Sequence, residues 1–145
     1  LKTQGSSCDQ PVISMDFFPT LKDLAGLGEE AGPGLDGRSL VPFMNNPDLR
    51  EDRKLVWHYP HYHGSSWRPG SALRSGSWKL VEFYEDGKLE LYDLSKDVGE
   101  KTNLRETFPK LADSIRHELF RLLDEMGSAY PERKPGAEEI KKKGI

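Results

Sequence analysis

Residues 78–94 read WKLVEFYEDGKLELYDL, and this stretch decides the fold. Two runs of mostly apolar and aromatic residues flank the tetrapeptide Glu85-Asp86-Gly87-Lys88. Asp-Gly between such runs is a strong signal for a β-hairpin turn. Strand alternation puts apolar side chains on both faces, so we expect one face to pack on a helix and the other to be partly covered. Trp78, Leu80, Glu82 and Tyr84 share one face of the hairpin, and Lys79, Val81 and Phe83 share the other.

The clearest helix signal follows this hairpin. Residues 109–126 carry apolar side chains at helical spacing, and Pro109 suits a first turn. The expected apolar stripe consists of Leu111, Ile115, Leu119, Leu122 and Met126. A second, shorter helix is predicted near the N-terminus, in DFFPTLKDLAG, with Asp16 as its cap and Gly26 as its stop.

Two further strands are predicted upstream of the hairpin, at 55–59 and 72–75, whereas 26–54 reads as a long, glycine-rich connection. The fold class is therefore α+β: a small antiparallel sheet with a long C-terminal helix packed on it. The N-terminal helix and the connection look like parts of a larger body. We divide the chain into 1–54, which belongs to that body, the sheet-and-helix subdomain 55–131, and a flexible tail 132–145.

Composition limits the function classes. The 145 residues carry a net charge of −3, which does not favour a nucleic-acid partner. No apolar run approaches the roughly 18 residues of a membrane span, and no signal peptide is visible. Only 35% of the residues are hydrophobic, and the chain opens at Leu1 rather than Met. We therefore expect a fragment whose apolar surface belongs against a missing domain.

A cluster of histidines follows the first predicted strand. His58, His61 and His63 lie in LVWHYPHYH, a strand-to-loop segment. The spacing can gather nitrogen ligands for zinc, but no cysteine is near and the nearest carboxylates precede the strand. A simpler alternative is that the aromatic neighbours pack while the histidines form surface hydrogen bonds. We favour a third interpretation, in which a histidine-rich rim recognises hydroxyl groups or an anion.

Two arginines strengthen the third interpretation. Arg68 and Arg74 follow the histidines, and a guanidinium presents a planar fork to sulfate, phosphate or carboxylate. Trp67 beside Arg68 suits stacking on a sugar. The alternative, in which both arginines pair with surface carboxylates, stays open.

Other reactive groups point to no catalytic site. Cys8 lies in SSCDQPV, with no nearby histidine and no glycine-rich turn, and a lone cysteine is more often inert. Asp93, Asp97, Glu100 and Asn103 lack the spacing of an EF-hand loop, so turn formation and capping explain them more simply. We assign no catalytic residue and no metal ligand to this chain.

Taken in order, several segments resemble the C-terminal part of bacterial arylsulfatase-type sulfatases, from about Pro11 to Pro131. They are DFFPTLKDLAG, LDGRSLVPFM, LVWHYPHYH, then SALRSGSWKLVEFYEDGKLELYDLSKDVGEKTNL, and finally the P-x-L-A helix. The strands with W-K-L and E-L-Y-D-L and the turn G-E-x-x-N-L carry most of the resemblance. The family has an alkaline-phosphatase-like body, with which a smaller C-terminal subdomain packs.

The resemblance implies a formylglycine nucleophile made in a C/S-x-P-x-R motif, and a calcium ion held by the larger body. Cys8 departs from that motif, because Asp9-Gln10-Pro11-Val12 supplies neither the proline nor the arginine at the required positions. The fragment alone is therefore expected to be inactive and to bind no cofactor. The resemblance implies a periplasmic or extracellular parent enzyme.

The leading hypothesis is the C-terminal part of a sulfatase that hydrolyses sulfate esters of carbohydrates. Its expected partners are a sulfated carbohydrate and the missing N-terminal sulfatase domain, with no nucleic acid and no membrane. The subdomain would supply part of the substrate rim through His58, His61, His63, Arg68 and Arg74. The alternative is a free-standing module that binds carbohydrates or anions without catalysis.

Overall fold

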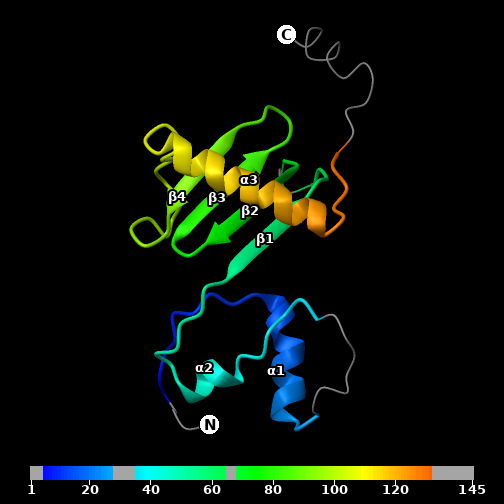
Figure 1. Ribbon diagram of the computed structural model, residues 1–145, viewed down its shortest axis with the longest axis vertical. Helices are drawn as coiled ribbons and strands as arrows, with labels where there is room; N and C mark the ends of the chain where they lie inside the picture. Colours follow the sequence, from blue (N-terminus) through cyan, green and yellow to red (C-terminus); the bar gives the residue numbers. More distant parts are fainter. Residues whose placement is uncertain (1–4, 28–34, 65–67, 132–145) are drawn as a thin grey trace. The chain divides into compact units, whose positions relative to one another are not determined.

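The computed structural model describes residues 5–27, 35–64 and 68–131 and forms two compact units that meet in the sequence between Arg53 and Lys54 (Figure 1). The assignment of residues 1–54 to a larger catalytic body stays a prediction, and the predicted tail 132–145 lies outside the described residues.

The second unit is built on a four-stranded antiparallel sheet in the simple order β1-β2-β3-β4. Its strands are β1 (Lys54–Tyr59), β2 (Gly70–Ser75), β3 (Trp78–Phe83) and β4 (Leu89–Asp93). Each predicted strand is present within one or two residues. The turns have the expected chemistry, because Gly76 and Gly87 adopt positive φ angles of 59° and 66° that L side chains avoid.

Helix α3 (Pro109–Glu125) lies across one face of this sheet (Figure 1). The core between them consists of Leu73, Leu80, Leu91, Ala112, Ile115, Leu119 and Leu123. The predicted helix is confirmed, but its buried stripe is shifted. Ala112 and Leu123 are fully buried, whereas Met126, after the helix, is 60% exposed. The fold is therefore α+β, as expected.

The first unit contains little regular structure. It has a short 3-10 turn, η1 (Ser14–Asp16), the predicted helix α1 (Phe17–Leu24) and a five-residue helix α2 (Val41–Asn45) that the sequence analysis missed. Gly26 follows α1 with a φ of 69°, as expected for a helix stop. Asp16 occupies the N-cap position, but its side chain makes no capping bond.

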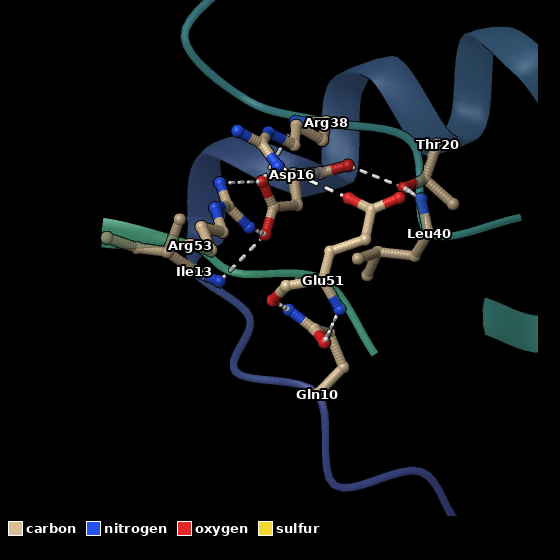
Figure 2. Close-up of polar contacts among 8 residues, drawn as sticks. All are labelled: Gln10, Ile13, Asp16, Thr20, Arg38, Leu40, Glu51 and Arg53. Atoms are coloured by element: carbon tan, nitrogen blue, oxygen red, sulfur yellow. Dashed lines mark hydrogen bonds and ion pairs between the residues drawn. The ribbon is translucent and has the colours of Figure 1, made fainter. Parts of the chain in front are cut away.

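The carboxylate of Asp16 instead organises the unit (Figure 2). It accepts hydrogen bonds from both terminal nitrogens of Arg53, at 2.6 and 2.7 Å, and from the backbone N–H groups of Ile13 and Arg38, at 2.9 and 3.0 Å. Asp16 is completely buried, so four donors compensate the loss of water. We call Asp16 and Arg53 the clasp.

A second pair of contacts lies beside the clasp. Gln10 donates its side-chain amide to the carbonyl of Glu51, and the Glu51 N–H donates back to the Gln10 side chain, at 3.1 and 3.0 Å (Figure 2). The segment before α1 is thus joined to the segment before β1 by polar contacts that span about 40 residues of sequence. A Cβ on Gly37 would lie 1.9 Å from the Met15 carbonyl oxygen, so this close approach requires glycine.

Candidate functional site

The five residues predicted to contact substrate lie in three places on the second unit. His58 lies on the α3 side of the sheet, at the end of β1. His61, His63 and Arg68 lie in the connection between β1 and β2. Arg74 lies near the other end of β2.

His58 belongs to a hydrogen-bonded network beneath the residues that follow α3. Its Nδ1 atom lies 2.6 Å from the Ser71 hydroxyl and 3.1 Å from the Tyr84 hydroxyl, and its Nε2 atom lies 2.9 Å from the carbonyl oxygen of Ala129. A carbonyl only accepts, so Nε2 donates to Ala129, while Nδ1 contacts the two hydroxyl groups. These contacts give His58 a structural role.

Two tyrosines complete the surroundings of His58. Burial raises the pKa of Tyr84. Burial, and then the hydrogen bond to Asp124, raise the pKa of Tyr130 to about 12. Tyr130 lies edge-on to both the His58 and the Tyr84 rings and stacks on Phe120. Both phenols therefore remain protonated at neutral pH and act as hydrogen-bond donors.

His61 and His63 occupy a different environment. Both are exposed, and their rings lie edge-on to Tyr59, with centroids 5.9 and 6.4 Å from its ring. Tyr59 is one residue beyond His58 on β1, so alternation directs it to the face away from α3. The two histidines are thus grouped around an aromatic ring at one end of the sheet.

Arg68 lies at this same end, where the connection enters β2. Its guanidinium carbon is 4.2 Å from the centre of the Phe83 ring. Its Nη1 atom lies 3.1 Å from Asp86 and 3.7 Å from Glu85, in the β3–β4 turn. Tyr62 donates its hydroxyl to Glu85 at 2.7 Å, which joins the connection to the same turn. Of the two surface ion pairs that the alternative interpretation predicted, the one of Arg68 is present, and its guanidinium lies over an aromatic ring.

Arg74 does not join this group. It lies four residues from Gly70 along β2, which corresponds to about 13 Å of strand. Its Nε donates to the Gly76 carbonyl at 3.2 Å, in the β2–β3 turn. We therefore define the candidate rim as His61, His63 and Arg68, and the substrate roles of His58 and Arg74 stay predictions. Trp67 lies outside the described residues.

Metal-ligating side chains are not grouped in the described part of the chain. Within 5–27, 35–64 and 68–131, no three His, Cys, Asp or Glu side chains are grouped to hold a metal ion. The calcium implied by the family resemblance therefore does not fit these residues. The cluster after β4 forms turns: Asp97 accepts from the N–H groups of Lys101 and Thr102, and Asn103 from that of Leu91. Cys8 is exposed, and its sulfur lies 3.8 Å from Arg50.

The sequence analysis missed one buried charge in the second unit. The Glu82 carboxylate, on the α3 side of β3, accepts two hydrogen bonds of 2.8 Å from Arg116 of α3. The signal was present in the sequence, because a glutamate on a core-facing strand position needs a cationic partner.

No helix in the described part of the chain has the length and apolar character needed to cross a membrane.

Comparison with known proteins identifies the family. The family model of the N-sulphoglucosamine sulphohydrolase C-terminal region matches residues 2–128. The chain belongs to this sulfatase C-terminal family. A sulfatase of Formosa agariphila is 36% identical over 104 residues, covering 66% of this chain and 19% of the relative. A choline-sulfatase of Rhizobium meliloti is 40% identical over 97 residues, and the match covers 66% of this chain and 18% of the relative.

A solved structure supports the same assignment to the sulfatase C-terminal family. A protein in complex with its substrate, D-glucosamine-2-N,6-O-disulfate, superposes with a TM-score of 0.55 and 28% identity. The match covers 75% of this chain and 23% of that protein. The chain thus spans about a fifth of the length of the relatives it matches. The resemblance stated from the sequence is confirmed.

Proposed function

We propose that this sulfatase C-terminal chain belongs to a longer enzyme that hydrolyses sulfate esters of carbohydrates, and that it supplies part of the substrate rim. The family match over residues 2–128 carries this proposal. The related structure with a disulfated glucosamine supports a sugar substrate. The match to a choline-sulfatase makes a small non-sugar sulfate the substrate to test against it.

The candidate rim has suitable chemistry. A guanidinium held over Phe83 by Asp86 is positioned before a ligand arrives, so less side-chain entropy is lost on binding. A sulfate group would compete with Asp86 for Arg68. Exposed imidazoles of His61 and His63 can donate to sulfate oxygens or sugar hydroxyls. His58 is not part of this rim, because both of its ring nitrogens contact neighbouring groups of the fold.

The chemistry of ester cleavage is assigned to the rest of the enzyme. Formylglycine and calcium remain proposals for residues outside this chain, as does a periplasmic or extracellular location. Support for a missing protein partner comes from α1, where Phe17, Phe18, Leu21 and Leu24 are 63, 57, 66 and 51% exposed. A contiguous apolar surface of this kind is typical of a protein interface.

The test compares the isolated chain with the complete product of its gene. The complete product should release inorganic sulfate from 2-N,6-O-disulfated glucosamine faster than from choline sulfate, and the 145-residue chain should release none. In the complete product, Arg68→Ala should raise KM for the sugar about tenfold, because a charge-assisted contact is lost. Arg121→Ala, which removes only exposed ion pairs within α3, is the matched control and should leave KM within about twofold. Equal effects of the two substitutions would contradict the rim assignment.

The second candidate, a binding module without catalysis, also has support. The unit that begins at Lys54 has its own core, with Leu73, Leu80, Leu91 and Leu119 fully buried. This candidate predicts that the complete gene product binds the disulfated sugar but releases no sulfate.

A further inference from the structure

We infer that Trp57 and Tyr59 form a second carbohydrate contact, which stacks on neighbouring sugar rings of an anionic oligosaccharide. We call these two residues the aromatic strip. The inference deepens the proposed function and rests on it, because the strip extends the candidate rim from one sugar to several. None of the contacts discussed above assigns a role to Trp57.

The strip arises from the alternation of β1. Trp57 and Tyr59 are two residues apart and so share a face, with about 7 Å between their positions. Val56 packs against the core and His58 contacts Ala129 after α3, so these two residues lie on the α3 side of the sheet. Trp57 and Tyr59 alternate with them and lie on the opposite face. The cross-strand neighbours of the strip are Ala72 and Gly70. Neither neighbour is large enough to cover an aromatic ring.

Exposure on this face is selective. The aliphatic side chains Leu55, Ala72 and Val81 are only 4, 8 and 7% exposed, whereas Trp57 and Tyr59 are 41 and 39% exposed. A protein-binding surface usually exposes aliphatic side chains as well, as α1 does. A surface that exposes only amphipathic aromatic rings suits the C–H face and the hydroxyl edge of a sugar. The contrast favours a carbohydrate over a protein as the occupant.

The charges around the strip match an anionic ligand. At one end, Tyr59 lies against His61 and His63 of the rim, beside the loop that carries Arg68. At the other end, Arg74 shares this face and pairs across the strands with Leu55, next to Trp57 along the strip. A sugar chain with sulfate groups on more than one ring would meet Arg74 at one end of the strip. At the other end it would meet two imidazoles and Arg68, whose pairs with Asp86 and Glu85 a sulfate would have to displace. Trp57 lies about 7 Å further along the strand than Tyr59, so a ligand that contacts both residues extends past the rim.

The test measures binding as a function of ligand length. The 145-residue chain is titrated by calorimetry with heparin-derived oligosaccharides of two and of six sugar rings. Trp57→Ala should weaken binding of the six-ring probe about tenfold, the loss expected for one stacking contact, and leave the two-ring probe within about twofold. Trp57→Phe, which keeps a ring, should stay within about threefold of the parent for both probes.

Several outcomes would overturn the inference. The first is that the parent chain does not bind the six-ring probe. The second is that the parent and Trp57→Ala bind this probe with equal affinity. The third is that Trp57→Ala weakens binding of both probes equally. A Trp57→Ala chain that binds unchanged but self-associates less in analytical ultracentrifugation would assign the strip to protein contact instead. Binding is measured independently of sulfate release. If the chain binds the sugar but the complete gene product is inactive, the proposed reaction is refuted and the inference about the aromatic strip stands.

Discussion

Asp16 and Arg53 form a largely buried ion pair that joins the start of α1 to the residue before β1. The two Nη···Oδ distances are 2.6 and 2.7 Å, and the side chains are 0 and 8% exposed. Two backbone N–H groups occupy further acceptor positions on the same carboxylate. In the first unit, with its short helices and long irregular segments, this polar centre replaces much of the packing that a hydrophobic core provides elsewhere.

Removal of the arginine should therefore strongly destabilise the first unit. Arg53→Met leaves the Asp16 charge buried without its cationic partner, which costs about 3 to 5 kcal/mol. The unfolding free energy is measured in urea by the NMR methyl signals of Ile13, which report on this unit. Arg38→Ala is the control, because its side chain forms only an exposed pair with Glu51 and should change stability by less than about 1 kcal/mol. Equal losses of unfolding free energy in the two variants would show that the clasp stabilises the unit no more than an exposed ion pair does.

The clasp should also make stability depend on acid pH. The hydrogen bonds from Arg53, then those from the backbone of Arg38 and Ile13, lower the pKa of Asp16 from 3.8 to about 2. A lowered folded-state pKa gives stability that is fully present above about pH 4 and is lost as the pH falls through about 2. The contribution is about 2 to 3 kcal/mol. The stability difference between the parent chain and Asp16→Asn should shrink from pH 5 to pH 2, and a constant difference would contradict this origin.

The fold of the second unit was readable from sequence because its signals are local. Alternation in β3 and the Asp86-Gly87 turn specify a hairpin within 17 residues, and the period of α3 specifies the helix that covers it. Helix α2 was not predictable in this way. Five residues are too few to show a period or to be stable alone, so tertiary contacts, such as the burial of Phe43, must hold it.

The site was predicted only in part, for a related reason. The sequence grouped three histidines and two arginines because they are close along the chain, but the face and the end of the sheet at which each lies depend on distant partners. His58 is held by Ala129, which is 71 residues away. Arg68 is oriented by the next hairpin turn, 18 residues on. Strand alternation alone could have placed His58 and Tyr59 on opposite faces of the sheet, but it could not have identified the partner of either residue.

The Glu82–Arg116 pair should contribute more than the surface pairs of the same helix. Arg116→Ala leaves a Glu82 side chain that is only 5% exposed without its two donors, and should destabilise the second unit by about 2 to 4 kcal/mol. All three tryptophans lie in this unit, so their fluorescence in urea reports its unfolding. Arg121→Ala, which removes exposed pairs with Glu118 and Glu125, is the control and should cost less than about 1 kcal/mol. A smaller loss for Arg116→Ala than for Arg121→Ala would refute the ranking.

The division of the histidines can be tested with two matched variants. His58→Ala removes a partner of the Ser71 and Tyr84 hydroxyls and of the Ala129 carbonyl, so it should destabilise the second unit by about 1 to 3 kcal/mol. His61→Ala removes an exposed ring and should change stability by less than about 0.5 kcal/mol. Binding of a disulfated sugar should show the reverse order, with a several-fold loss for His61→Ala and little change for His58→Ala at temperatures where the variant is folded. If His58→Ala weakened binding more than His61→Ala while the unfolding midpoints stayed equal, the rim would have to be redrawn on the α3 side of β1.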